Sequence, residues 1–112
     1  MKDDLVFIEH ILDSINAIKE FSKGITLNEI TSNRLKRDAI VRNIEIIGEA
    51  INKISKETKD KYRNVQWKYI VGARNKMIHN YLGIDYEIVW EIIKKDLPLL
   101  EKQIKEIKNN LG

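Results

Sequence analysis

Residues 34–55 read RLKRDAIVRNIEIIGEAINKIS, and this stretch decides the fold. Its apolar residues recur at helical spacing and cover more than one narrow stripe: Leu35, Ala39, Ile40, Val41, Ile44, Ile46, Ile47, Ala50, Ile51 and Ile54. A helix this apolar is contacted on several sides, so we expect it at the centre of a helical bundle. Gly48 lowers the helix propensity in its middle, which indicates that a second helix approaches closely there.

The residues before this stretch predict a long amphipathic helix and a short helical turn. Apolar side chains recur at helical spacing from Leu5 to Phe21, and Gly24 fits the end of that helix. Thr26 and Glu29 have the spacing of a capping box, which opens the short turn.

The residues after the stretch predict a loop and three further helical segments. Residues 56–64 are charged and are expected to form the loop. We expect a helix over 66–80, a second one capped by Asp85, and a fresh start at 96–98, because proline is tolerated in the first turn of a helix. No segment alternates as a strand does. The expected fold is therefore an all-α, up-down bundle of four to five helices in a single domain, residues 1–112.

The composition, 43% hydrophobic and 33% charged, is typical of a folded, water-soluble domain. The absence of cysteine excludes disulfides and thiolate metal sites and fits a reducing cytoplasm. No apolar run is long enough to cross a bilayer, and the N-terminus does not read as a signal peptide, so we expect a cytoplasmic protein without a membrane segment. The net charge of +3 suits an anionic partner such as RNA, although many ordinary domains carry this charge.

Residues 74–81, RNKMIHNY, concentrate the side chains that can do chemistry near neutral pH. On a helical wheel Arg74 falls on an apolar face, together with Trp67, Ile70, Val71, Ile78 and Tyr81. An unpaired charge on a core-facing stripe is costly. Arg74 therefore either serves a site or pairs with a carboxylate of the long helix, Glu45 or Glu49.

His79 lies five residues after Arg74, roughly 140° away around a regular helix. The two side chains share a site if the helix loosens towards Gly83, or if two copies of the helix face each other across a symmetric dimer. Such a dimer site would hold two imidazoles and two guanidiniums.

That set of groups suits cleavage of an RNA phosphodiester without a metal. One imidazole removes the proton of the ribose 2′-OH and another protonates the leaving 5′-oxygen. The guanidinium binds the phosphate and stabilises the transition state. Asn75, four residues before His79, can orient the imidazole or donate to a phosphate oxygen. Taken singly, His79 also fits a partly buried structural histidine, and Tyr81 fits an aromatic packed at the end of the apolar stripe.

The spacing Arg-Asn-x3-His-x-Tyr resembles the Arg-x4-6-His motif of HEPN-domain ribonucleases, and in particular the Arg-x4-His-x-Tyr form of the HepT toxin family. The surrounding sequence is similar to that family as well, in the long helix at 42–50, the approach to the motif at 66–75, and the tail at 84–85, 89–90 and 96–100. The resemblance covers nearly the whole chain, from Leu5 to about Leu111.

This resemblance implies a HEPN bundle that forms a homodimer, with the motif in a composite cleft. It implies a metal-independent endoribonuclease without a cofactor, in which Arg74 and His79 are catalytic. It also implies the toxin of a type VII-like toxin–antitoxin pair that acts on RNA such as tRNA or mRNA. In such systems a nucleotidyltransferase antitoxin of the MntA type uses ATP to AMPylate the motif tyrosine, here Tyr81, and silences the ribonuclease.

Other interpretations stay open. Asn75, Glu45 and Glu49 are expected to support the site. One or both of the glutamates would hold Arg74 or contact the cleft, yet each also fits a solvated carboxylate on a charged helix face. The chain could be a non-catalytic module that binds a nucleotidyltransferase or a nucleotide, or a helical adaptor in which Arg74 is only an ion-pair member. His10 is expected to have no catalytic role. Two dispersed histidines without cysteine predict no metal site.

Overall fold

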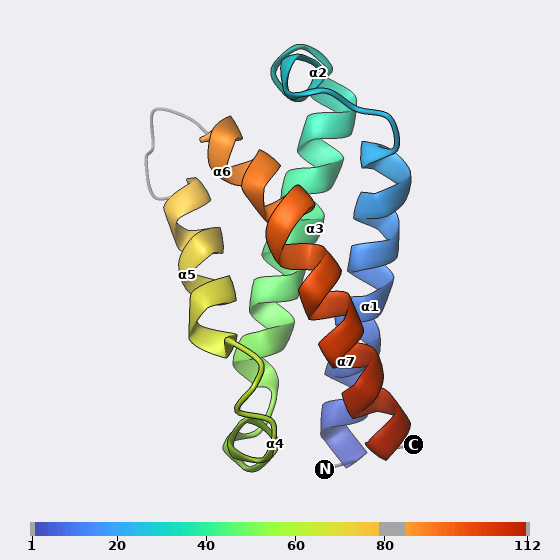
Figure 1. Cartoon of the computed structure of the whole chain (residues 1–112), viewed down its shortest axis with the longest axis vertical. Coiled ribbons are helices and arrows are strands. Elements are labelled where there is room, and N and C mark those ends of the chain that lie inside the picture. The colour runs from blue at the N-terminus through green and yellow to red at the C-terminus, as the bar shows by residue number, and fades with distance from the viewer. Residues whose placement is uncertain (1, 79–84, 112) are drawn as a thin grey trace.

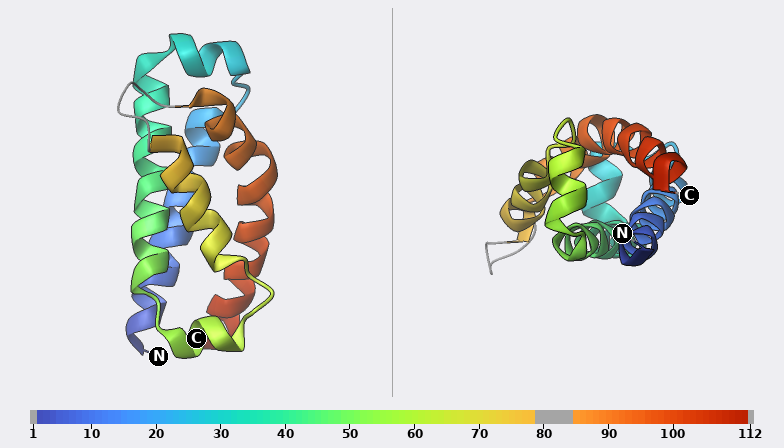
Figure 2. Two further views of the ribbon diagram at one scale, coloured as in Figure 1. Left: turned by 90° about the vertical axis from the view of Figure 1, so that its left-hand side faces the viewer. Right: turned by 90° about the horizontal axis from the view of Figure 1, so that it is seen from below.

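The computed structural model describes residues 2–78 and 85–111, and this part of the chain consists of helices joined by short turns, with no strand (Figure 1). The longest elements are α1 (Lys2–Ser22), α3 (Arg34–Lys53), α5 (Trp67–Ile78) and α7 (Leu97–Leu111). They run roughly along the long axis of a molecule that measures 41 × 27 × 20 Å (Figure 2). The predicted all-α bundle is confirmed.

The central place of α3 is confirmed too. This helix packs against α1, α5 and the short helix α2 (Leu27–Ser32), and Figure 1 shows it between α1 and α5. The core around it is rich in isoleucine side chains that are almost fully excluded from water: Ile8, Ile11, Ile15, Ile18, Ile40, Ile47, Ile51, Ile104 and Ile107. Each such side chain stabilises the fold by roughly 1.5–3 kcal/mol. This cluster therefore supplies most of the attraction between the helices.

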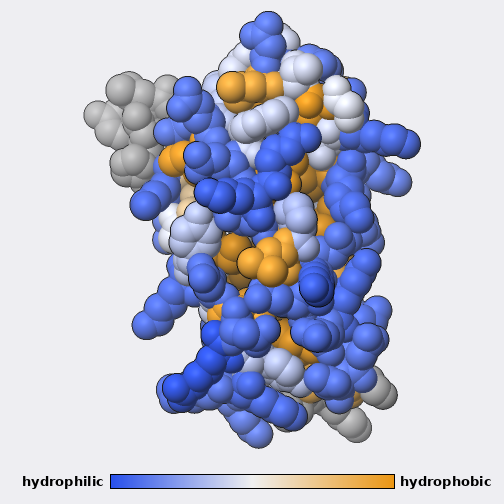
Figure 3. Space-filling view, viewed as in Figure 1, coloured by the Kyte–Doolittle hydropathy of each residue, from blue (hydrophilic) through white to orange (hydrophobic). Residues whose placement is uncertain are grey.

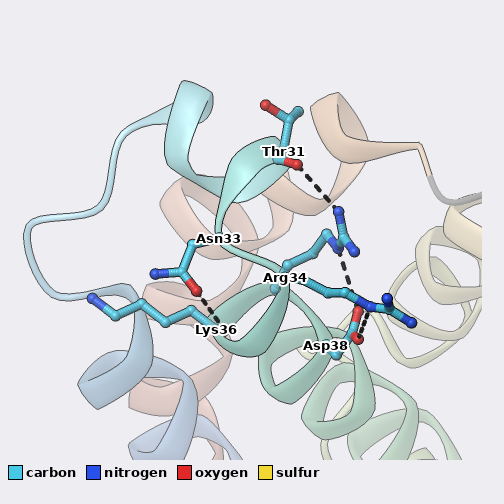
Figure 4. A network of polar contacts seen from close by, with 6 residues as sticks. Thr31, Asn33, Arg34, Lys36 and Asp38 are labelled. Atoms are coloured by element: carbon cyan, nitrogen blue, oxygen red, sulfur yellow. Dashed lines mark hydrogen bonds and ion pairs between the residues drawn. The ribbon is translucent and has the colours of Figure 1, made fainter.

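Polar side chains fix the corner between α2 and α3 (Figure 4). Thr26 caps α2 as predicted, since its Oγ1 accepts from the backbone N–H three residues later at 3.2 Å. Asn33 caps α3, where its Oδ1 accepts from the N–H of Lys36 at 3.1 Å. Arg37 then donates from Nη1 to the carbonyl oxygen of Thr31 at 3.1 Å. These contacts set the direction in which the central helix starts.

The predicted loop over 56–64 is wrong in its first part, because Lys56–Lys61 form the short helix α4. Ser55 caps this helix, with its Oγ accepting from the N–H of Thr58 at 3.2 Å. The buried carboxylate of Asp4, on α1, accepts from the N–H and Oγ of Ser55 at 2.9 and 2.6 Å and from Oγ1 of Thr58 at 2.5 Å. The helix forms because a carboxylate 51 residues earlier than Ser55 completes its cap, and no local pattern shows that contact.

Two predicted helices lie on either side of the motif residues His79 and Tyr81. The helix expected over 66–80 begins at Trp67 and is described to Ile78, while its expected end lies outside the described residues. Asp85 caps α6 (Tyr86–Glu91) as predicted, because its Oδ1 accepts from the second and third N–H groups that follow it, at 3.1 and 3.2 Å.

The predicted helix start at 96–98 is confirmed, because α7 begins at Leu97, but no break in the helical chain precedes it. The chain continues from α6 through a π-helical turn, η1 (Ile92–Asp96), directly into α7. The N–H of Leu97 donates to the carbonyl oxygen of Ile92, five residues back. Pro98 has no N–H, and in a regular helix its ring clashes with the carbonyl four residues back. The wider π-turn directly before Pro98 accommodates both effects, so the helix bends without ending.

The surface of the bundle is mainly hydrophilic, as expected when the apolar side chains of the helices face the core. Figure 3 shows a face on which hydrophilic side chains predominate and apolar side chains form separate patches. None of the helices in residues 2–78 and 85–111 combines the length and the apolar character needed to cross a bilayer.

Candidate active site

Arg74 projects from α5 onto the middle of α3, where Gly48 makes room for it. A Cβ atom at Gly48 would lie 3.3 Å from Cγ of Arg74 and 3.4 Å from its Cδ. These distances are tighter than ordinary van der Waals contact, so a side chain at position 48 pushes against the arginine. The close approach predicted at Gly48 is confirmed, and the group that approaches is the aliphatic stem of Arg74.

One carboxylate and one amide hold the guanidinium of Arg74. Its Nη2 lies 3.7 Å from Oε2 of Glu45, and its Nη1 donates to Oδ1 of Asn75 at 3.0 Å. The Arg74 side chain is 25% exposed and that of Glu45 is 28% exposed. The buried Nε of Arg74 finds no acceptor within the described part of the chain. The group is oriented, but its five N–H donors are not all used.

The two candidate carboxylates on α3 have different partners. Glu45 faces Arg74, whereas Oε1 of Glu49 lies 3.4 Å from Nη1 of Arg42. Both side chains of the second pair are more than half exposed, so solvent screens their attraction. Glu45 therefore forms the ion pair that the sequence left open between Glu45 and Glu49.

His79 and Tyr81 lie outside the described residues, and so does the predicted angle between Arg74 and His79. The chain on both sides of them is described. The N–H of Asp85 donates to the carbonyl oxygen of Met77 at 3.2 Å, and Met77 is fully buried. The described chain thus leaves α5 and returns to it at one point, about one turn beyond Arg74.

Three further residues complete the account of the residues that the sequence singled out. Asn75 is exposed and gives its oxygen to Arg74, while its predicted contact with His79 lies outside the described residues. For Gly48 the sequence predicted only a close helix contact and no link to the site. The sequence does hold a signal for the contact between Gly48 and Arg74. A glycine lies inside a long apolar helix, and an arginine lies on the core-facing stripe of another helix. His10 lies exposed on α1, edge-on to Phe7, with 6.2 Å between the ring centroids.

Comparisons with known proteins identify the family of the chain. A family model described as "Ribonuclease HepT-like" matches residues 11–107, a range that contains Arg74 and all its described partners. A protein of Methanocaldococcus jannaschii named "Putative RNase" is 43% identical over 104 residues, which cover 93% of this chain and 95% of its own. A protein of Caldanaerobacter subterraneus subsp. tengcongensis with the same designation is 44% identical over 107 residues, 96% of each chain.

A more distant relative carries the family's name. This "Probable ribonuclease HepT" of Thermococcus cleftensis is 29% identical over 102 residues, 91% of this chain and 93% of its own. No solved structure matches the chain. The family match over residues 11–107, with identities above 40% over nearly the full length of two relatives, shows that the chain belongs to the ribonuclease HepT-like family.

Proposed function

We propose that this protein is an endoribonuclease that cleaves RNA without a metal ion or cofactor, at a site shared by two copies of the chain. The setting of Arg74 carries the proposal, because its half-buried guanidinium is oriented by Glu45 and Asn75 and keeps donors unused. His79 follows five residues later in the same motif. Membership of the family and the names of its relatives support RNA, such as tRNA or mRNA, as the substrate.

The proposed reaction needs one neutral and one protonated imidazole. The neutral imidazole of His79 takes the proton of the ribose 2′-OH. The 2′-oxygen then bonds to the adjacent phosphorus, and the bond from phosphorus to the 5′-oxygen breaks. The protonated imidazole of the second copy gives its proton to that oxygen. The products are a 2′,3′-cyclic phosphate and a 5′-hydroxyl, and Arg74 stabilises the extra negative charge of the transition state.

A symmetric homodimer explains how two imidazoles reach one phosphate. Each chain has a single motif histidine, His79, and His10 lies on α1, outside the motif. A regular helix would turn His79 roughly 140° away from Arg74. Two motifs that face each other across a two-fold axis would bring both kinds of side chain to one cleft.

We further propose that the protein is a cytoplasmic toxin of a type VII-like pair and that its partner is an MntA-type nucleotidyltransferase. The phenol oxygen of Tyr81 would attack the α-phosphorus of ATP, and pyrophosphate would leave. AMP on Tyr81 would add bulk and negative charge where the substrate phosphate binds, and the two phosphates would repel each other. The motif form Arg-x4-His-x-Tyr supports this assignment.

A second function is favoured by one observation. The Glu45 carboxylate partly neutralises Arg74, as it would in a non-catalytic module that binds a nucleotidyltransferase or a nucleotide. Such a module would bind its partner without cutting RNA.

Substitution of each histidine tests the proposal. His79→Ala should lower the rate of RNA cleavage at least about 100-fold, because a general acid–base group contributes that much or more. His10→Ala is the matched control and should cleave like the wild type. Cleavage should survive EDTA and leave 2′,3′-cyclic phosphate ends. Equal cleavage by the two variants would refute the proposed chemistry, and a wild type that binds its partner but never cleaves would favour the module.

The partner proposal has its own measurement. Intact mass after incubation with ATP and the nucleotidyltransferase should increase by whole AMP units in the wild type and stay constant in Tyr81→Phe. AMP found on Tyr81→Phe would show that another residue is the target.

A further inference from the structure

A basic groove opens beside the Arg74 site, between the end of α3, α4 and the first half of α5. Its volume is about 830 Å³. Its walls carry the cationic side chains of Lys56, Lys59, Arg63 and Lys68 and the carboxylate of Asp60. We call this hollow the basic groove. Figure 3 shows that hydrophilic side chains predominate over α4 and the start of α5 on the face it presents.

The protein leaves most of this positive charge without a counter-charge. Asp60 is engaged by Lys56, whose Nζ lies 2.9 Å from Oδ2. No carboxylate of the described chain forms an ion pair with Lys59 or Lys68. Arg63 donates from Nε to the backbone oxygen of Asp60 at 3.2 Å and acts on the Asp60 carboxylate only at longer range. The whole chain has a net charge of +3, so the lining of the basic groove carries as much excess charge as the entire molecule. An anionic ligand would be attracted here.

The basic groove reaches the neighbour of Arg74, although Arg74 itself is not part of its lining. Asn75 belongs to its lining, and the oxygen of Asn75 accepts from Arg74 at 3.0 Å. From Trp67 to Asn75, α5 advances about 12 Å along the wall, at about 1.5 Å per residue. Gly72 is part of this wall, and a Cβ atom there would meet no other atom within 4 Å. The space along α5 is therefore open up to the residue beside the guanidinium.

We propose that the basic groove binds the phosphate backbone of the RNA strand on one side of the phosphate held by Arg74. The inference rests on the proposed ribonuclease function. The cations are spread over α4, the turn after it and α5, and this suits a chain of phosphates better than one compact anion. Trp67 is 8% exposed, and its Nε1 donates to the carbonyl oxygen of Tyr62, so its ring is not presented for stacking on a base. Binding should depend on charge and little on base sequence.

The test compares two triple variants of the full chain that remove the same charge. The groove variant is Lys59→Gln/Arg63→Gln/Lys68→Gln. The control variant also changes two lysines and one arginine, around α2 at the opposite end of the molecule from α4 (Figure 1); it is Lys23→Gln/Arg34→Gln/Lys36→Gln. Fluorescence anisotropy measures the binding of 2′-O-methyl RNA, which lacks the attacking hydroxyl, over a series of salt concentrations.

For the groove variant we expect an RNA affinity at least about tenfold lower than that of the wild type at about 0.1 M salt. The slope of log affinity against log salt should become shallower by about 2, since each lost contact to a single strand removes about 0.7. RNAs of different sequence should lose affinity equally. The control variant should keep both the affinity and the slope close to those of the wild type.

The other outcomes overturn the inference in distinguishable ways. If the wild type cleaves RNA and the groove variant binds RNA as tightly as the control variant, the proposed role of the basic groove is refuted and the ribonuclease proposal stands. If the wild type neither binds nor cleaves RNA, both the groove proposal and the ribonuclease proposal are wrong. If the groove variant loses its dimeric mass or its nucleotidyltransferase while RNA affinity stays unchanged, the groove is a protein-binding surface.

A steric variant tests the same groove without changing charge. Gly72→Leu fills the open space beside α5 and replaces glycine by a better helix former, so the fold should be kept. It should lower RNA affinity several-fold, whereas Gly72→Ala adds one methyl group and should change it little. Equal affinity of Gly72→Leu and the wild type would overturn the inference even if the groove variant fails to fold.

Discussion

Asp4 and Arg74 are both charged side chains drawn into the bundle, but their surroundings differ. Asp4 is 2% exposed and accepts three hydrogen bonds of 2.5, 2.6 and 2.9 Å from Ser55 and Thr58. Arg74 is 25% exposed, meets its carboxylate at 3.7 Å and keeps a buried Nε that lacks an acceptor in the described chain. A charge that serves the fold is satisfied by the protein itself. A charge that keeps donors unused is available to a ligand, and this difference supports the role proposed for Arg74.

Arg74→Gln should produce the largest effect. Loss of one charge-stabilising donor group typically lowers the catalytic rate by about 10²–10³. The free energy of unfolding should change by less than about 1 kcal/mol, because the ion pair is long and partly exposed. Cleavage rates and urea unfolding measure the two quantities.

Arg42→Gln is the matched control, since Arg42 also pairs with a glutamate of α3 but lies exposed. It should leave both quantities near the wild type. Unfolding of Arg74→Gln at much lower urea, with unchanged activity per folded molecule, would instead place Arg74 with Asp4 among the structural charges.

Asp4→Ala should have the opposite profile. It leaves three donors of Ser55 and Thr58 without their acceptor, and we expect a loss of about 3 kcal/mol in the free energy of unfolding. Activity per folded molecule should be unchanged. Asp3→Ala, which removes the exposed neighbouring carboxylate, should stay within about 0.5 kcal/mol of the wild type.

The pH dependence sharpens the same prediction. Burial by itself would raise the pKa of Asp4, but the hydrogen bonds from Ser55 and Thr58 outweigh it and hold the pKa below its ordinary value of 3.8. A folded-state pKa below the unfolded one stabilises the fold above pH 3.8, and this stabilisation is lost as the pH falls through the lower folded value. The stability gap between the wild type and Asp4→Asn should therefore narrow in acid. A gap that is constant down to about pH 2 would show that the carboxylate charge is unimportant.

The two regions also differ in how far the sequence could predict them. The wheel placed Arg74 on the core-facing side, and the glycine at 48 signalled a close helix contact, because both are properties of a single helix. The choice of Glu45 over Glu49 depends on how α3 is rotated against α5, which no local pattern contains. The Asp4 cap was missed entirely, because its partners lie 51 and 54 residues away.

The sequence did not predict helix boundaries that depend on distant contacts or on backbone geometry. The patterns at Thr26 and Asp85 predicted caps correctly, since a cap needs only the next few residues. The π-turn before Pro98 was read as a break, because proline at a helix start and proline after a π-turn have the same local sequence. The approach of Arg74 to His79 involves residues outside the described chain and, in the proposed site, a second copy of the chain, so it stays a prediction.

Gly48→Ala probes the contact through which the fold positions Arg74. The added methyl group would lie 3.3 Å from Cγ of Arg74, so the stem must shift by a few tenths of an ångström. Alanine also improves helix propensity by about 1 kcal/mol, so stability should change little. We expect cleavage to fall about tenfold, since small displacements of a catalytic group have large effects. Gly72→Ala is the control on α5, where a methyl group meets no atom; equal activities of the two variants would show that Gly48 does not position the arginine.

Asp96→Asn should have the smallest effect and extends the comparison to a partly buried charge. Burial raises the pKa of Asp96 and the nearby negative charge of Glu91 adds to this, although Lys95 and a hydrogen bond from Tyr69 act the other way. With the folded-state pKa above the unfolded one, the ionised carboxylate opposes folding at neutral pH, and this penalty vanishes below the ordinary value of 3.8. Asp96→Asn keeps an acceptor for Tyr69, so it should be more stable than the wild type at pH 7 by less than about 1 kcal/mol and equal to it near pH 3. A wild type that is the more stable protein at pH 7 would mean that the bond from Tyr69 outweighs burial, and Asp96 would then belong with Asp4.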